Sequence, residues 1–169
     1  MQRGRTMIDK FTIRFATKKD VSLIRSFIKD LAHHLKLTED MVTKDMLRAS
    51  LFGKNKHAEV ILGYYKQKPV GFALFFHKFS TPLGRPGLYL EDLYIKPTMR
   101  GKGFGKRLLI FLAKLAKERK CARFEWIALK SDKQAINFYK KNIGAEAKDE
   151  WVLFRLENNA LDKFATTLL

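Results

Sequence analysis

The chain has 169 residues, of which 46% are hydrophobic, and this composition suits a single globular domain and excludes a disordered protein. Its 34 Lys and Arg residues against 17 Asp and Glu give a formal net charge of +17, which attracts polyanions of any kind. The single cysteine, Cys121, excludes an internal disulfide, and no Cys/His cluster predicts a metal site. No apolar run approaches the roughly 20 residues of a membrane span and no signal-peptide pattern is present, so we expect a cytoplasmic protein without a membrane partner.

The first half of the chain alternates extended and helical patterns. Hydrophobic periodicity predicts strands over 11–15, 58–65 and 70–77, and helices over 21–35 and from about Thr38 to Leu51. Thr17 or Asp20 can cap the first helix. Residues 79–87 contain two prolines and two glycines, and we predict a loop there.

The second half continues the same alternation without a linker or an internal repeat. The pattern predicts strands over 88–95, 123–129 and 151–156, and helices over 104–120 and 133–141. The segment from Asn158 onward is predicted to be a short helix or frayed. The chain is therefore expected to fold as one mixed α/β domain.

A glycine-rich turn between a predicted strand and a predicted helix is the most informative motif. It reads Arg100, Gly101, Lys102, Gly103, Phe104, Gly105 and Lys106. Three glycines leave backbone N–H groups uncovered, and the following helix N-terminus and the cations favour an anion. The spacing and the position past mid-chain disfavour a dinucleotide-binding turn, and no Gly-Lys-Ser/Thr follows that would make a Walker loop. A coenzyme A pyrophosphate site is the favoured interpretation, and a flexible connection is the alternative.

Three stretches together resemble the GCN5-related N-acetyltransferases (GNAT). They are Leu90 to Ile95, the glycine turn, and Ala135 to Lys141 followed by Gly144. The spermidine/spermine and thialysine N-acetyltransferase branch is the most similar. The resemblance implies an α/β (α+β) fold over residues 11–157, with terminal extensions at 1–10 and 158–169. Its central sheet would be mixed, mostly antiparallel, flanked by helices and splayed where the cofactor enters.

The resemblance also implies an activity and a set of site residues. Acetyl-CoA would be the donor, and a small primary amine, lysine-like or a diamine, would be the acceptor. Glu91 would be the base and Tyr139 the acid, and a backbone N–H near Leu93 or Tyr94 would stabilise the developing oxyanion. The cofactor contacts implied are Leu93, Tyr94, Ile95, Arg100, Gly101, Lys102, Gly103, Phe104, Gly105, Lys106 and Asp132.

Several residues leave alternatives open or depart from the branch. Glu91 could instead be a surface carboxylate, and Asp92 is expected to form a structural pair unless the strand bulges. Relatives usually have Asn near the start of the last helix, where this chain has Ser131 and Asp132, and Asp132 makes a sound helix N-cap. One extra residue between Tyr139 and Gly144 predicts a reshaped helix end.

The expected binding partners are inferred from the net charge and from the lack of acidic residues in the stretches expected to bind the acceptor. The stretches expected to bind an acceptor, Ser80 to Leu83 and His33 to Leu35, contain no acid that could offset the desolvation of a polycation, which disfavours spermine. We expect a homodimer. A nucleic acid is not the expected partner, although sequence-independent contact stays an alternative. The alternative functions are a protein lysine or N-terminal acetyltransferase and a non-catalytic CoA-binding domain.

Overall fold

The computed structural model describes residues 10–37 and 42–167 and divides the chain into two compact units, residues 1–127 and 128–169. The first unit contains a five-stranded sheet in the order β1-β2-β3-β4-β5. The first four strands pair antiparallel and β5 pairs parallel to β4. The predicted fold class, with a mixed and mostly antiparallel sheet, is therefore confirmed.

The strands are longer in the middle of the sheet than the sequence predicted. They are β1 (Phe11–Phe15), β2 (Glu59–Tyr65), β3 (Lys68–Ser80), β4 (Arg85–Ile95) and β5 (Phe124–Trp126). Residues at both ends of the predicted 79–87 loop belong to β3 and β4 and pair with each other. The loop is therefore only residues 81–84. That prediction was wrong because prolines and glycines can also occur in a twisted strand end next to a tight turn.

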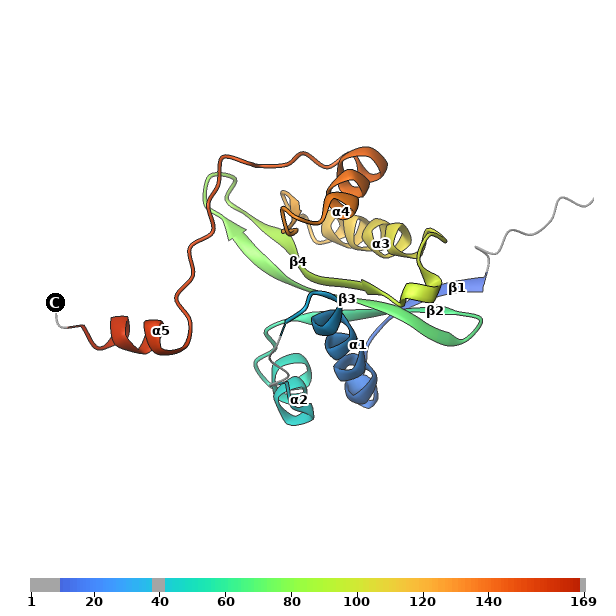
Figure 1. Ribbon diagram of the computed structural model, residues 1–169, viewed down its shortest axis with the longest axis horizontal. Helices are drawn as coiled ribbons and strands as arrows, with labels where there is room; N and C mark the ends of the chain where they lie inside the picture. Colours follow the sequence, from blue (N-terminus) through green and yellow to red (C-terminus); the bar gives the residue numbers. More distant parts are fainter. Residues whose placement is uncertain (1–9, 38–41, 168–169) are drawn as a thin grey trace, which may run out of the picture. The chain divides into compact units, whose positions relative to one another are not determined.

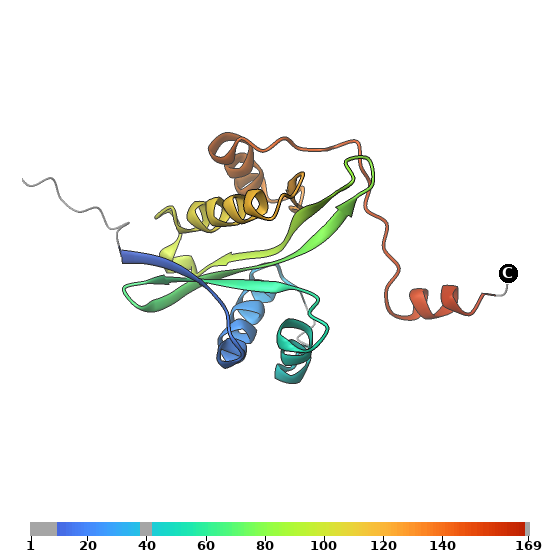
Figure 2. The same ribbon diagram turned by 180° about the vertical axis from the view of Figure 1, so that it is seen from behind.

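Helices of the first unit cover both faces of this sheet, and they are α1 (Val21–His34), α2 (Lys44–Phe52) and α3 (Phe104–Glu118). The second unit contains the helices α4 (Lys133–Asn137) and α5 (Asn158–Ala165). Figure 1 shows α1 and α2 on one face of the sheet and α3 on the other, and Figure 2 shows the same layers from behind. None of the helices in the described part of the chain is long and apolar enough to cross a membrane.

Aromatic contacts fix each layer to the sheet. On the α1 side, Phe27 stacks on Phe72 with ring centroids 5.6 Å apart. On the α3 side, Phe104 stacks on Phe11 at 4.5 Å. Because Phe104 is the first residue of α3, this contact holds the N-terminus of α3 against the sheet. The predicted start of the second helix lies outside the described residues, and α2 begins after Thr43, whose hydroxyl accepts a hydrogen bond from the Met46 N–H (3.2 Å).

Two predicted strands differ in the structure. The strand predicted over 123–129 pairs only at β5, and the strand predicted over 151–156 does not form. Trp151 and Phe154 are instead 78% and 89% exposed. A strand forms only where a partner supplies hydrogen bonds, and hydrophobic alternation does not specify a partner. The helix predicted for the tail is present as α5.

Candidate functional site

β4 is irregular at the predicted base. Leu74 of β3 lies opposite Asp92, and the next residue, Phe75, lies opposite Leu90, so Glu91 has no residue opposite it. Such a β-bulge inserts one extra residue, bends the strand and redirects side chains. The bulge that would allow the Asp92 side chain to take part in a site is thus present in the structure.

The two carboxylates at the bulge have no cationic partner within residues 10–37 and 42–167. Glu91 is exposed and Asp92 is half-buried, and neither makes a hydrogen bond or ion pair with the residues described. Burial and, to a smaller extent, the adjacent Glu91 carboxylate raise the pKa of Asp92 to about 6. The expected structural pairing of Asp92 was therefore wrong. A chain with 34 Lys and Arg residues could pair these acids, so their isolation favours a site for an external cation.

Beyond the bulge, one edge of β4 is open. β4 and β5 pair only through Leu88 to Leu90 on one strand and Phe124 to Trp126 on the other. No other strand in the described ranges continues the pairing along residues 91–95. The sheet is therefore open between these two strands, as the sequence analysis predicted.

The open edge presents particular backbone groups. The Lys96 N–H donates to the Val70 carbonyl of β3 (2.9 Å), so alternation along the strand directs the N–H groups of Leu93 and Ile95 away from β3. Of the two residues predicted for oxyanion stabilisation, Leu93 has the suitable backbone direction. Tyr94 is instead a core side chain, 5% exposed, whose ring lies 5.8 Å from that of Phe27.

The glycine turn has the backbone that an anion site requires. Gly101 and Gly103 have φ values of +75° and +79°, a region that favours glycine, and a Cβ added to either would meet no atom within 4 Å. Gly103 is the N-cap of α3, without a side-chain cap and without an acidic residue in the first turn. The N-terminal N–H groups of α3 thus have no side-chain cap, and the helix dipole gives this end a partial positive charge.

The cations of the turn differ in how they are held. The Arg100 Nε donates to the Ile95 carbonyl (3.0 Å), and its Nη1 lies 3.5 Å from the Nε2 of His34. Lys102 Nζ donates to the Thr98 carbonyl (3.3 Å), whereas Lys106 is exposed. Arg100 therefore links the turn to β4 and to the end of α1. The proximity of His34 was missed, because no local sequence signal connects residues so far apart.

The second unit contains the other two predicted site residues. The Asp132 carboxylate accepts a hydrogen bond from the Ala135 N–H (2.9 Å), which confirms it as the N-cap of α4. Tyr139 lies in a π-helical segment, η4 (Phe138–Ile143), that follows α4 directly and ends at Gly144, with φ +76°. Burial, and secondly the charge of Asp132, raise the pKa of Tyr139. The extra residue before Gly144 is thus accommodated by a wider helical turn, which confirms the predicted reshaping.

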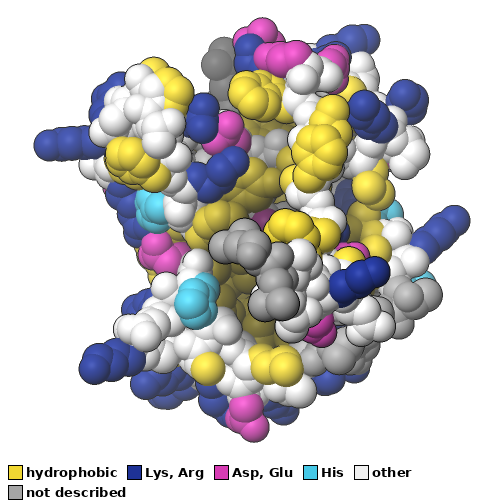
Figure 3. Space-filling model, turned by 90° about the vertical axis from the view of Figure 1, so that its left-hand side faces the viewer, with side chains coloured by type: hydrophobic (Ala, Val, Ile, Leu, Met, Phe, Trp, Pro, Cys, Tyr) yellow, Lys and Arg dark blue, Asp and Glu magenta, His cyan; other side chains and the backbone are white. Residues whose placement is uncertain are grey.

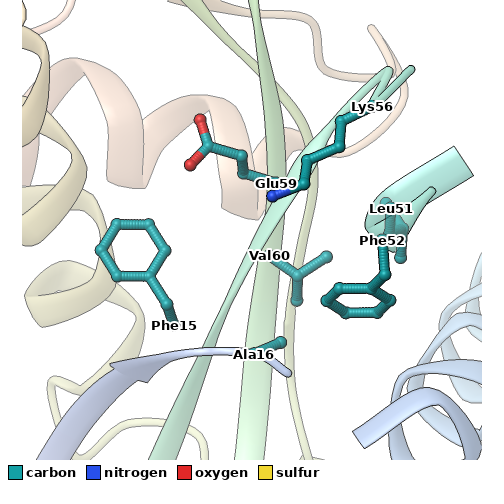
Figure 4. Close-up of a pocket in the computed structure, with 7 residues that line it drawn as sticks. All are labelled: Phe15, Ala16, Leu51, Phe52, Lys56, Glu59 and Val60. Carbon is teal, nitrogen blue, oxygen red and sulfur yellow. The ribbon is translucent and has the colours of Figure 1, made fainter. Parts of the chain in front are cut away.

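One cavity in the first unit, of about 250 Å³, contains none of the predicted site residues. Figure 4 shows its lining, which is Phe15, Ala16, Leu51, Phe52, Lys56, Glu59 and Val60. Glu59 is held there by Arg119, which donates to both carboxylate oxygens and lowers the pKa of Glu59. Within residues 10–37 and 42–167, no group of three or more His, Cys, Asp or Glu side chains is placed to hold a metal ion.

Comparison with known proteins identifies relatives over most of the chain. The sequence model of the acetyltransferase (GNAT) family matches residues 26–145. The chain is 32% identical over 165 residues to thialysine N-epsilon-acetyltransferase of Sus scrofa, covering 90% of this chain and 96% of the relative. It is 43% identical over 91 residues to an L-ornithine N5-acetyltransferase of Arabidopsis thaliana, covering 54% of this chain and 40% of that relative.

A solved structure is also similar. An integron cassette protein from the mobile metagenome of V. cholerae superposes with a TM-score of 0.79 at 28% identity. The superposition covers 94% of this chain and 99% of that chain. The two chains therefore share their fold over nearly their whole length.

The state of Asp92 predicts how stability depends on pH. Its native pKa of about 6 exceeds the usual value of 3.8, so the native state binds this proton more tightly than the unfolded state does. The contribution of Asp92 to the free energy of unfolding therefore falls as pH rises through this interval. Asp92→Asn should raise the free energy of unfolding near neutral pH by on the order of 2 kcal/mol, and the gain should vanish near pH 4, in urea titrations.

Asp20→Asn is the matched control with the opposite sign. Arg14 makes a bidentate hydrogen bond to Asp20 (2.8 and 2.7 Å), which holds the pKa of that carboxyl well below its usual range. The stabilising contribution of Asp20 is therefore present at neutral pH and lost in acid, so its replacement should lower the free energy of unfolding near pH 7. A loss of stability in both variants would show that Asp92 has a structural partner.

Proposed function

Because the chain belongs to the acetyltransferase (GNAT) family and is an N-acetyltransferase, we propose that it transfers the acetyl group of acetyl-CoA to the primary amine of a small lysine-like or diamine compound. The observation that carries the proposal is the pair of unpartnered carboxylates, Glu91 and Asp92, at the start of the open edge of β4. Among the described residues of a +17 chain, neither acid has a cationic partner, which suits them to an incoming ammonium group.

The donor would bind along the glycine turn. The uncapped N–H groups of α3 and the left-handed backbone at Gly101 and Gly103 suit the pyrophosphate of coenzyme A, with Lys106 as an exposed cation beside it. The backbone of Leu93 to Ile95 would extend this contact along the open edge. The side chain of Asp132 already accepts a backbone hydrogen bond, so its contact with the cofactor would be limited to its free oxygen.

The residues at the bulge would prepare the acceptor. An ammonium cannot attack a carbonyl, so Glu91 or a water that it orients would remove one proton and expose the nitrogen lone pair. The nitrogen then forms a bond to the acetyl carbonyl carbon, the carbon–sulfur bond breaks, and the acylated nitrogen releases its second proton to water. The Leu93 N–H would stabilise the negative charge on the carbonyl oxygen, because its hydrogen points to the open edge.

Tyr139 would donate a proton to the departing thiolate. Its raised pKa keeps the phenol protonated at neutral pH, as an acid requires, and lowers its tendency to ionise beside Asp132. The π-helical segment fixes the register of Tyr139, because its carbonyl accepts from both Gly144 and Ala145 N–H groups.

The acceptor is proposed from charge and from relatives. Glu91 and Asp92 provide for one ammonium group, and relatives of this chain are named for thialysine and L-ornithine. An extended tetracation would require further carboxylates to offset its desolvation. A compound with one or two amines therefore fits better than spermine.

The proposal is tested by thiol release from acetyl-CoA with purified protein. Lysine, thialysine, ornithine, a short diamine, spermine and a lysine-containing peptide are compared by kcat/KM at two ionic strengths. Turnover should be greatest with a small lysine-like amine or diamine. Preference for the peptide would favour a protein acetyltransferase, and acetyl-CoA binding without turnover on any amine would favour a non-catalytic domain.

Tyr139→Phe is the control for the chemistry in the same assay. It keeps the ring and deletes the proton donor, so kcat should fall by roughly 10²- to 10⁴-fold with acetyl-CoA affinity unchanged. Phe138→Leu alters the neighbouring aromatic residue and should change kcat little. Equal losses in both variants would show that Tyr139 has a packing role only.

The cofactor assignment is tested with two glycines in the same conformation. Gly103 and Gly84 both have positive φ (+79° and +59°), and a Cβ at either meets no atom within 4 Å. Replacement by Ala should therefore strain each backbone by a similar 1–2 kcal/mol, roughly. Only Gly103→Ala should raise the Kd for acetyl-CoA in calorimetry, by about tenfold. Equal acetyl-CoA affinities in the two variants would show that the pyrophosphate does not bind at this turn.

We further propose that the chain forms a homodimer through residues 151–156. Trp151, Val152, Leu153 and Phe154 are all exposed, and contiguous apolar surface of this kind marks an interface. A second copy of the chain is the proposed occupant. Phe154→Asp should convert a dimer to a monomer in sedimentation velocity, whereas Met46→Asp, at an exposed apolar residue of α2, should not. A monomeric parent chain at high concentration would contradict this proposal.

A further inference from the structure

The exposed face of α3 carries a row of lysines. Lys106, Lys114 and Lys117 are exposed, and Ile110 and Ala113 are the exposed residues between them. Positions separated by three, four or seven residues lie on the same side of a helix, so these side chains share one face. We call Lys106, Lys114 and Lys117 the α3 lysine row. In the sequence they are separate residues, and only the helix places them together.

The α3 lysine row is not neutralised by neighbouring acids, whereas several arginines of the same unit are. Ion pairs in the first unit join Arg14 to Asp20, Arg48 to Asp45 and Arg119 to Glu59. The three lysines of the row make no ion pair with any residue that the structure describes. Glu118 is the single acid of α3, and it follows the row at the end of the helix. The row is therefore a local excess of positive charge.

The length and the composition of the row suit a phosphate backbone. With a rise of 1.5 Å per residue, Lys106 and Lys117 are separated by roughly 16 Å along the helix axis. Duplex DNA carries one phosphate charge for about every 1.7 Å of its axis, so several phosphates lie within that length. Lysine ammonium groups on flexible stems can follow phosphates without fixed geometry. No aromatic side chain lies on this exposed face, so it has no platform for stacking bases.

We propose that the α3 lysine row binds the phosphodiester backbone of a duplex nucleic acid without regard to sequence. This inference does not depend on the proposed acetyltransfer. The opposite side of α3 is buried through Leu108, Leu112 and Leu115, so the helix presents the row in a fixed direction. Lys and Arg side chains are also visible at many places on the surface in Figure 3, and the net charge of +17 would attract the same polyanion.

An acidic protein is a poorer fit to the same surface. Stable protein interfaces contain an apolar core or aromatic anchors that exclude water. The exposed face of α3 offers one large apolar side chain, Ile110, which is 44% exposed. Phosphate contacts need no such core, because counterion release supplies most of the free energy of non-specific binding.

The test compares two double variants with the same change in charge. Lys114→Glu/Lys117→Glu reverses two members of the row, and Lys44→Glu/Lys54→Glu reverses two exposed lysines beside α2, on the opposite face of the sheet (Figure 1). Each full-length protein is titrated into a fluorescent 20-base-pair duplex, as DNA and as RNA of the same sequence, at several salt concentrations. A polyglutamate peptide is the third probe. Acetyl-CoA affinity is measured for every protein and should not change.

The parent chain should bind both duplexes with a Kd of roughly 10⁻⁴ to 10⁻⁶ M near physiological salt. The α3 variant should bind about tenfold more weakly, with a log–log salt slope that is smaller by about 2, because each phosphate contact contributes about 0.9. The α2 variant should stay within about twofold of the parent chain. Preference for one duplex identifies which nucleic acid is bound. Equal losses in the two variants, tighter binding to polyglutamate, or no duplex binding at low salt would overturn the proposal.

Discussion

The pairing of β4 is the constraint on which the candidate site depends. On one side β4 pairs with β3 as far as Ile95, and on the other it pairs with β5 only as far as Leu90. The bulge at Glu91 lies where the second partner ends. This difference opens one edge of β4 and directs the Leu93 N–H into the opening, and the chain then passes through a short 3-10 helix (Pro97–Met99) into the glycine turn. The two carboxylates, the open backbone N–H groups and the glycine turn thus follow one another along a single strand and the segment after it.

The charged form of Asp92, on the same strand, is electrostatically unfavourable. Burial disfavours the charged form of Asp92, and the nearby Glu91 adds repulsion, although cations are abundant elsewhere in the chain. Asp20 shows how the fold treats a structural acid, because Arg14 and the Thr17 N–H both bond to it. A protein usually keeps an unpaired half-buried charge where a function requires it. The contrast between these two acids is a physical reason, independent of any relative, to place the site at β4.

The sequence predicted those features that short stretches determine. Periodicity located α1 and α3 to within about two residues at each end, and the glycines at 101 and 103 marked a turn that requires positive φ. Features that depend on distant pairing were predicted poorly. Neither the shortness of β5 nor the proximity of His34 to Arg100 has a local signal. The lack of a partner for Asp92 among the described residues was also missed. The sequence gives the number of Lys and Arg residues, but it does not give their distances from Asp92.

Residues 138–143 show how the fold absorbs a change in length. An extra residue in an α-helix would rotate every later side chain by about 100° and move Gly144 off its capping position. The π-helical turn widens instead, and the Tyr139 carbonyl receives both the Gly144 and the Ala145 N–H groups. π-turns are uncommon and are often found at functional sites. The distortion is therefore confined to the turn between Tyr139 and Gly144, and Gly144 still ends the helix in the left-handed conformation that favours glycine.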